Sequence, residues 1–394
     1  MVVGFGRHAV DLYTASRVGV LDTGLDPELF VAASLNPLLA AGRPAWQAVR
    51  GGLRRVLARP DALPPGVLVP RGELTMALPV EVGDYVDGYG GIHHATNMGE
   101  MVRPGSDPLA PNWRRMPVAY HGRSSTVVPS GTPVVRPAGQ MLLDGRPGFG
   151  PTAMLDVELE LGFVVGTGSR RAEPVDIAEA GEHVFGVVLL NDWSARDIQL
   201  SESQPLGPFL GKSFATSISV WVVTLDALAP YMVGGLAAAQ DPEPAAYLRT
   251  AEPWIPDLQL EIALQSATMK ERGIDPVVVA HVRFAEAMYW SMAQQLAHAT
   301  VNGATVRPGD LFGSGTASGP DAATQGGSLL ELTWGGSRPL ELPTGERRAF
   351  LEDGDTVVMR GHCVDPAGSE GIRLGEVVGT VVPARLSLQR RDAR

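Results

Sequence analysis

Cysteine is almost missing from this sequence of 394 residues, in which Cys363 is the only one. A single cysteine excludes a disulfide within the chain and any zinc module built from several cysteines. The first residues also lack a basic region followed by a long apolar run, so we expect no secretory signal. Together these absences indicate a reducing compartment, and we expect the protein to be cytoplasmic.

Long apolar runs and positive charge are also scarce. No stretch approaches the roughly 20 consecutive apolar residues that a membrane-spanning helix needs, so we expect no membrane partner. Asp and Glu number 43 against 32 Lys and Arg, which gives a net charge of −11. Such an acidic chain is a poor electrostatic partner for nucleic acid. Hydrophobic residues make up 44% of the chain, which excludes disorder as its main state.

Two motifs of common enzyme classes are absent. The sequence contains no G-x-S-x-G, which argues against a serine hydrolase with a nucleophile elbow. The glycine run at residues 313–319 has neither the G-x-G-x-x-G spacing nor a following lysine, so it does not predict a nucleotide site. Lysine is rare as well, since Lys212 and Lys270 are the only two. Because an ammonium group differs from the planar fork of arginine, we single out Lys212, which lies among small residues.

The length predicts two or three domains. Residues 1–83 form a small unit, in which apolar residues at three- and four-residue spacing predict a helix over residues 44–57. Residues 81–97 are polar and rich in glycine, as in a loop that serves a site. From residue 84 onward strand patterns dominate, so the larger unit is predicted to be mostly β. An amphipathic helix is predicted over residues 284–299.

Alternating carboxylates stand out at residues 155–161, where Asp156, Glu158 and Glu160 alternate with apolar residues. This pattern predicts a half-buried strand with the three carboxylates on one face. Carboxylates in this arrangement can bind one cation from one side, but taken alone they are more typical of a sheet face that is open to water. The apolar residues 162–165 follow directly and favour a strand that enters a core.

Polar groups follow a second strand pattern. Asp192 comes directly after apolar residues 187–190, and it suits either a metal ligand or the N-cap of a following turn. Arg196 is positioned to pair with Asp192 or Asp197. Upstream, His93 and His94 lie among carboxylates and a phenol in residues 84–97, and either imidazole could serve as a general base. Glu331, flanked by leucines, is predicted to be partly buried with a partner such as histidine.

Taken together, these segments resemble the fumarylacetoacetase family. The likeness runs from about residue 4 to about residue 383, and the uninterrupted blocks 191–199 and 205–214 are its most specific part. The Glu-x-Glu pair alone would not identify the family. The other matching stretches are residues 84–97, 117–123, 158–160, 307–311 and 314–316.

The resemblance implies a mostly β (α+β) fold. A small N-terminal SH3-like barrel would cover residues 1–83, and a large C-terminal β-roll would cover residues 84–394, in a homodimer. The resemblance also implies a bound divalent cation, Mg²⁺ or Ca²⁺. Hard cations of this kind take oxygen ligands, and clustered carboxylates without a cation would repel one another or take up protons. The implied metal-site residues are Asp87, Glu158, Glu160 and Asp192, with Lys212 and Thr216 beside them.

The implied reaction is the metal-dependent hydrolysis of a carbon–carbon bond in a β-diketo acid. It would convert 4-fumarylacetoacetate and water into fumarate and acetoacetate, the last step of tyrosine and phenylalanine catabolism. In the family pattern His94 is the general base and Glu331 orients it. Arg196, Gln199 and Lys212 would stabilise the oxyanion. The positions that match substrate contacts are Tyr89, Arg103, Tyr120, Gln199, Ser203 and Thr316.

Two departures from the family pattern bear on the substrate. Ser203 stands where the family usually has a tyrosine that helps to hold the substrate, and residues 90–93 lack the usual serine and arginine. One alternative is therefore a related hydrolase that acts on a different diketo acid in another pathway. Others are a metal-dependent decarboxylase, isomerase or hydratase, and a metal-binding scaffold without enzymatic activity. The pairing of His94 with Glu331 favours water activation.

Overall fold

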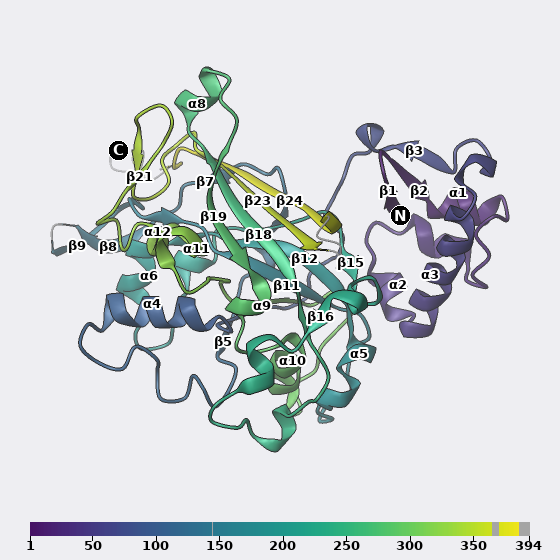
Figure 1. The fold of residues 1–394 in the computed structure, drawn as a ribbon, viewed down its shortest axis with the longest axis horizontal. Coiled ribbons are helices and arrows are strands. Elements are labelled where there is room, and N and C mark those ends of the chain that lie inside the picture. The colour runs from purple at the N-terminus through teal and green to yellow at the C-terminus, as the bar shows by residue number, and fades with distance from the viewer. Residues whose placement is uncertain (144, 365–369, 386–394) are drawn as a thin grey trace, which may run out of the picture.

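The computed structural model describes residues 1–143, 145–364 and 370–385 of the chain. These residues form a mixed α+β fold in which a large curled sheet packs against a second sheet, and an N-terminal unit lies beside them (Figure 1). Among the described residues, no helix combines the length and the apolar content that would let it cross a bilayer.

The N-terminal unit combines one small sheet with helices. Its three strands lie in the order β1-β2-β3, and both neighbouring pairs are antiparallel. The described strands and helices do not confirm the SH3-like barrel that the family resemblance implies. The bounds are β1 Val2–Phe5, β2 His8–Asp11, β3 Leu68–Pro70, α1 Leu12–Arg17, α2 Asn36–Ala40 and α3 Arg43–Leu57, with 3-10 turns at Pro27–Val31, Pro60–Ala62 and Arg71–Glu73.

The central sheet of the larger unit has eight strands. Seven follow the order β5-β4-β20-β11-β12-β14-β6, and β15 pairs with β12 off this path. Every residue of β11 and β12 is buried, because the sheet is covered on both faces. The expectation of a half-buried strand was therefore wrong. The bounds are β4 Tyr85–Gly88, β5 Ala119–His121, β6 Val127–Pro129, β11 Leu159–Val165, β12 Val184–Asp192, β14 Thr216–Ile218, β15 Val223–Thr224 and β20 Leu311–Gly313.

The second sheet covers one face of the central sheet. Its five strands follow the order β19-β18-β23-β24-β7, and one apolar core joins the two sheets. The approach is close at Gly379, where a Cβ atom would lie 2.3 Å from the Trp193 ring. Glycine is therefore required at this crossing. The bounds are β7 Val134–Val135, β18 Leu258–Gln265, β19 Val277–Arg283, β23 Thr356–Val364 and β24 Glu370–Val382.

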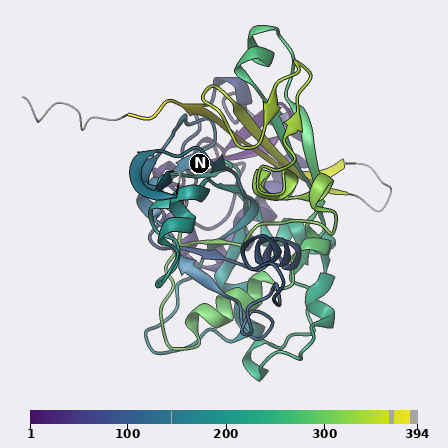
Figure 2. The same cartoon turned by 90° about the vertical axis from the view of Figure 1, so that its left-hand side faces the viewer.

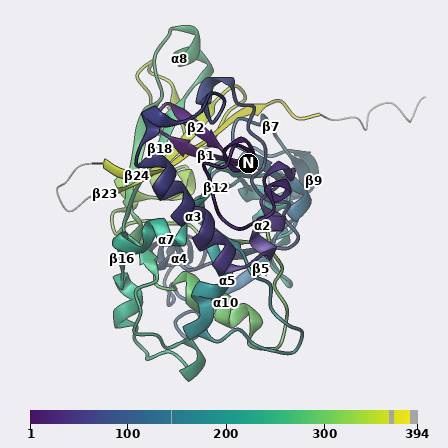
Figure 3. The same ribbon diagram turned by 90° about the vertical axis from the view of Figure 1, so that its right-hand side faces the viewer.

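The N-terminal unit packs on the opposite face of the central sheet. Helix α3, predicted over residues 44–57 and observed at Arg43–Leu57, lies in front of the sheet in Figure 3. Its apolar side joins Val164, Val188 and other sheet residues in a second core. The Trp46 ring packs edge-on against Phe185, with ring centroids 5.1 Å apart. This contact fixes the N-terminal unit to the central sheet.

The remaining helices lie in the segments between the strands of the larger unit. The side of the molecule that faces the viewer in Figure 2 carries α4, α6 and the β8–β9 hairpin. The helices are α4 Ile92–Val102, α5 Ala180–His183, α6 Arg196–Glu202, α7 Leu225–Leu228, α8 Ala267–Glu271, α9 Phe284–Ala287, α10 Met292–Thr300, α11 Ala322–Gln325 and α12 Leu329–Leu332. The two-stranded ribbons pair β8 Ala138–Leu143 with β9 Arg146–Pro151, β10 Leu155–Asp156 with β13 Ser194–Ala195, β16 Met232–Val233 with β17 Ile255–Pro256, and β21 Leu340–Glu341 with β22 Arg347–Arg348.

Two sequence expectations need correction here. Residues 81–97 were expected to form a loop, but they contribute β4 and the first half of α4. The strand forms because β4 gains hydrogen-bonding partners on both sides, β20 and β5. The helix expected over residues 284–299 is divided into α9 and α10, because Ser291 caps a new helix with a reciprocal bond to Gln294.

Candidate active site and metal centre

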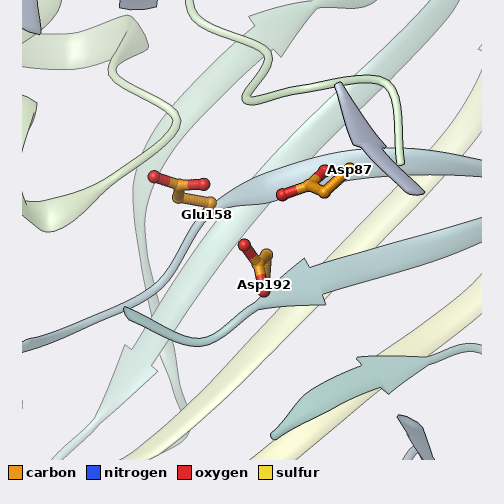
Figure 4. A group of neighbouring side chains, drawn as sticks. All are labelled: Asp87, Glu158 and Asp192. Carbon is orange, nitrogen blue, oxygen red and sulfur yellow. The ribbon is translucent and has the colours of Figure 1, made fainter. Parts of the chain in front are cut away.

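Three strands of one sheet bring three carboxylates together. Asp87 lies on β4, Asp192 ends β12, and Glu158 directly precedes β11. One oxygen from each lies within 4.8 Å of the others, and Figure 4 shows the side chains pointing toward a common centre. All three are at least 95% buried. Such a buried set of carboxylate oxygens suits a hard divalent cation.

Glu160 borders this group of carboxylates. At Gly313, a Cβ atom would lie 2.3 Å from Asp87 Oδ1 and 2.7 Å from Glu160 Oε2, so the two acids meet across a position where only glycine fits. Glu160 Oε2 accepts the Gly315 amide at 3.0 Å. Among the described residues, none donates a hydrogen bond to Asp87 Oδ1 or Glu160 Oε1. Two buried oxygens without donors are typical of atoms that face a cation.

The buried carboxylates differ in the direction of their pKa shifts. Burial raises the pKa of Asp87 well above its usual value, and the charge of Asp192 raises it further. Burial and the charge of Asp87 likewise raise the pKa of Glu160. Burial also opposes ionisation of Glu158, but Lys212 and Arg196 outweigh it and lower the Glu158 pKa. A cation between these groups would offset the repulsion that raises the first two pKa values.

Lys212 balances part of the negative charge. Its Nζ lies 2.5 Å from Glu158 Oε2 and 2.7 Å from Asp192 Oδ2, and its side chain is buried. Tyr120 donates to the same Asp192 oxygen at 2.9 Å, and Thr216 Oγ1 lies 3.3 Å from Asp192 Oδ1. Asp192 is thus held by three side chains at a strand end. It does not act as a helix N-cap, since Ala195 occupies that position for α6.

Arg196 lies on the other side of Glu158. Its Nε donates to Asp156 at 2.8 Å, and its Nη1 lies 2.7 Å from Glu158 Oε1 and 3.2 Å from Gln199 Oε1. The expected pairing with Asp192 or Asp197 was therefore wrong, because β10 and β13 place Asp156 next to the start of α6. Asp156 does not face the carboxylate centre, contrary to the prediction from its alternation with Glu158 and Glu160.

An imidazole and a carboxylate form the next layer. His94 Nδ1 lies 2.7 Å from Glu331 Oε2, and both side chains are buried. Glu331 accepts three further hydrogen bonds, from Asn97, Ser318 and Ser328. Burial opposes ionisation of Glu331, but the nearby His94 imidazole and the hydrogen bonds from Asn97 and Ser328 outweigh it and lower the Glu331 pKa. The opposite imidazole nitrogen, Nε2, lies 3.7 Å from Glu158 Oε1, so the ring lies between Glu331 and the group of three carboxylates.

Comparison with known proteins places this chain in a family. Residues 1–79 match the family model described as fumarylacetoacetase N-terminal, and residues 85–382 match the model described as fumarylacetoacetate hydrolase C-terminal. The chain belongs to the fumarylacetoacetase family. It is 44% identical to fumarylacetoacetase of Arabidopsis thaliana over 97% of this chain and 91% of that protein. It is also 44% identical to fumarylacetoacetase of Homo sapiens over 91% and 85% of the two chains.

Solved structures of lower identity share the fold. A fumarylacetoacetate hydrolase from psychrophilic Exiguobacterium antarcticum superposes with a TM-score of 0.54 at 18% identity, covering 98% of this chain and 95% of that one. A maleylpyruvate hydrolase from Sphingobium sp. SYK-6 gives a TM-score of 0.50 at 15% identity, covering 97% and 96%. At these identities the likeness concerns the fold of the fumarylacetoacetase family.

The residues that match substrate contacts in the fumarylacetoacetase pattern differ in their surroundings. The Tyr89 ring packs edge-on against His94 at 5.6 Å, and Thr316 Oγ1 is buried with no partner among the described residues. Arg103 is exposed at the end of α4, but its charge reaches Tyr89. Ser203 caps the end of α6 and donates its hydroxyl hydrogen bond to the Gln199 carbonyl at 2.5 Å. Nothing in its contacts directs Ser203 toward the carboxylates.

Sequence reasoning missed several supporting residues. Ser318 and Ser328 both donate to Glu331, and the Asn191 side chain accepts the Glu158 amide at 3.2 Å. Their positions in the sequence gave no signal, because serine and asparagine are common in turns. Only the buried partner of each one, the Glu331 carboxylate for the two serines and the Glu158 amide for Asn191, indicates a role.

Proposed function

We propose that this chain hydrolyses a carbon–carbon bond of 4-fumarylacetoacetate, releasing fumarate and acetoacetate in tyrosine and phenylalanine catabolism. The observation that carries the proposal is the buried His94–Glu331 pair, whose free imidazole nitrogen lies beside the carboxylate centre. Relatives with the name fumarylacetoacetase match nearly the whole chain at 44% identity, which supports the choice of substrate.

The first chemical task falls to His94. If Nδ1 carries the proton that Glu331 accepts, Nε2 has a lone pair and can take a proton from water. The water oxygen then bonds to the substrate carbonyl carbon. When the carbon–carbon bond breaks, its electron pair stays on the acetoacetate side, and the proton held at Nε2 can return to that carbon. Glu331 stabilises the imidazolium between these steps, and its own three donors keep it ionised.

The metal-site residues fit a divalent cation. We propose that Asp87, Glu158, Glu160 and Asp192 hold Mg²⁺ or Ca²⁺, with Lys212 and Thr216 beside them. When bound, such an ion supplies Lewis-acid assistance and a template for oxygen atoms of the substrate. The raised pKa values of Asp87 and Glu160, and the donor-free oxygen on each, support this assignment.

Three side chains are suited to stabilise negative charge that develops on the attacked carbonyl. Arg196 Nη2 is buried and has no hydrogen-bond partner among the described residues. Gln199 contacts the same guanidinium through its Oε1, and Lys212 presents a compact ammonium group at the opposite side of Glu158. Donors held in place before the reaction need little reorganisation, which is the usual source of oxyanion stabilisation.

The substrate itself would be held by groups around His94. We assign the half-buried Tyr89 and the buried Thr316 to the inner part of the substrate site, and Arg103 to its entrance, where an exposed guanidinium can bind a carboxylate. Tyr120 contributes indirectly in this structure, because its hydroxyl donates to Asp192.

A second candidate is hydrolysis of a different diketo acid in another pathway. Ser203 favours it, because the family usually has a substrate-holding tyrosine at this position and the serine hydroxyl is already bonded to Gln199. Comparing the turnover of several diketo acids, including fumarylacetoacetate, separates the two candidates.

We also propose that the chain is divided into an N-terminal unit of residues 1–83 and a catalytic unit of residues 84–394. The separate family models over residues 1–79 and 85–382 support this division. The family resemblance supports a cytoplasmic location and a homodimer. Sedimentation of the purified protein would test the homodimer.

The test follows the loss of the conjugated enol absorbance of fumarylacetoacetate in the presence of Mg²⁺ or Ca²⁺, with a chelator control and identification of both products. His94→Asn should abolish turnover. His93→Asn is the matched control, because this neighbouring imidazole on α4 is only half-buried and makes no hydrogen bond to Glu331. Absent turnover by the metal-loaded wild type, or equal loss in the two variants, would contradict the proposal.

A further inference from the structure

Asp156 is a buried carboxylate that the proposed mechanism does not use. Its side chain is fully buried and accepts four hydrogen bonds. Oδ1 accepts the amides of Val157 at 2.8 Å and Leu329 at 2.7 Å. Oδ2 accepts Arg196 Nε at 2.8 Å and the Leu330 amide at 3.1 Å. Because all four partners are donors, only the ionised carboxylate satisfies them all.

These four bonds connect two parts of the site that lie far apart in the sequence. Arg196 begins α6, whereas Leu329 and Leu330 begin α12, the helix that carries Glu331. Glu331 in turn holds the His94 imidazole. Asp156 therefore holds both the Arg196 guanidinium and the first turn of α12, the helix that carries Glu331.

We propose that Asp156 is a positioning residue that fixes the Arg196 guanidinium in its working orientation. This inference rests on the proposed function, in which Arg196 stabilises the oxyanion. Asp156 binds the Nε edge of the fork, and Glu158 binds Nη1. Carboxylates thus bind two of the three guanidinium nitrogens. The third, Nη2, is buried and has no hydrogen-bond partner among the described residues. A planar guanidinium fixed at two points directs its third nitrogen in one direction.

A purely structural ion pair would not explain this arrangement. Buried ion pairs are weak contributors to stability compared with apolar packing of similar volume, so stability alone gives little reason for one here. A pair that served only the fold would also be expected to satisfy all the guanidinium nitrogens, since a buried donor without a partner is costly. The unpartnered Nη2 indicates that a further acceptor binds at this site.

The test is a double-mutant cycle between Asp156→Asn and Arg196→Ala, read in kcat and KM for fumarylacetoacetate. An asparagine oxygen can still accept the Val157 and Leu329 amides, but its amide group would face Arg196 Nε, another donor. We expect Asp156→Asn to lower kcat by about 10- to 100-fold with little change in KM, the scale found for outer-shell partners. Arg196→Ala should lower kcat by about 10²- to 10³-fold, and the double variant should be no slower.

Asp197→Asn is the matched control. Asp197 is the next residue after Arg196 and also accepts backbone amides, from Ala153 at 2.8 Å and Ile198 at 2.9 Å, but no hydrogen bond joins it to Arg196 among the described residues. Asp197→Asn should lower kcat only slightly. In the double variant with Arg196→Ala, the fold-loss of kcat should equal the product of the two single losses. Multiplicative effects of Asp156→Asn and Arg196→Ala would overturn the proposal.

Two further measurements keep the proposal open to refutation. If Asp156→Asn does not fold, Arg196→Lys retains the charge without the fork; a kcat loss of about tenfold or more supports positioning, and wild-type kcat overturns it. If the wild type does not turn over fumarylacetoacetate, the proposed function fails. The same cycle is then read in kcat and KM for the diketo acid that the wild type does turn over, where coupled effects on kcat support positioning and multiplicative effects overturn it.

Discussion

Replacing Asp87 with asparagine should change the stability of the metal-free and metal-loaded protein in opposite directions. In the metal-free protein, the Asp87 carboxylate is buried within 4.8 Å of oxygens of Glu158 and Asp192, and it meets Glu160 across Gly313. Asparagine is nearly the same shape and carries no charge. The variant should therefore stabilise the metal-free protein and weaken cation binding.

The magnitude follows from the surroundings of Asp87. Two like charges near 5 Å repel by about 3–4 kcal/mol at an effective dielectric constant of about 20. If Asp87 takes up a proton instead, the cost at pH 7 is limited to about 4 kcal/mol, since the unfolded carboxyl has a pKa of about 4. We expect Asp87→Asn to raise the free energy of unfolding of the metal-free protein by about 1–4 kcal/mol.

The pH dependence has a defined sign. Burial and Asp192 raise the folded-state pKa of Asp87 above the unfolded value. The stability of the metal-free protein associated with this carboxyl is therefore fully present below the unfolded pKa, and it declines as the pH rises above about 4 toward the folded pKa. Asp87→Asn should remove this part of the decline.

The assay is urea unfolding of both proteins between pH 5 and 8, with chelator and with excess Mg²⁺ or Ca²⁺. Asp84→Asn is the control, because Asp84 is exposed and pairs with Arg307 on the surface, where such pairs contribute less than about 1 kcal/mol. A metal-free Asp87→Asn protein less stable than the wild type, or one that binds the cation as tightly, would refute the reasoning.

Three further predictions concern other parts of the chain. Glu331→Gln should lower kcat by about 10²- to 10⁴-fold without loss of cation affinity, because the glutamine amide can donate to His94 Nδ1 and leave the proton on Nε2; steady-state kinetics and metal titration check it. Ser203→Tyr should raise the rate with fumarylacetoacetate relative to other diketo acids, and unchanged relative rates would remove Ser203 from the argument. Trp46→Ala should cost about 3–5 kcal/mol in urea unfolding by opening a cavity against Phe185 and the central sheet, whereas a cost below 1 kcal/mol would contradict the docking of α3.

Local patterns were sufficient where one segment carries the signal. The spacing of Trp46, Val49, Leu53 and Val56 predicted α3, which begins one residue earlier than expected. The apolar run before Asp192 predicted β12 and its polar end. The alternating pattern predicted the wrong degree of burial for β11. The sequence of one strand cannot show that a second sheet covers one face of the central sheet and α3 the other.

The amino-acid sequence by itself determined the family, and the family pattern gave the candidate base His94 and the candidate ligands Asp87, Glu158, Glu160 and Asp192, because these depend on residue types at fixed positions along the chain. The tertiary structure decided which of them meet. Strands from distant parts of the chain place the three carboxylates within 4.8 Å, and α12 brings Glu331 to His94 across a separation of 237 residues. It also decided that Asp156 lies outside the group of three carboxylates and, together with Glu158, holds Arg196, because strand pairing and burial, rather than alternation, set the direction of that carboxylate.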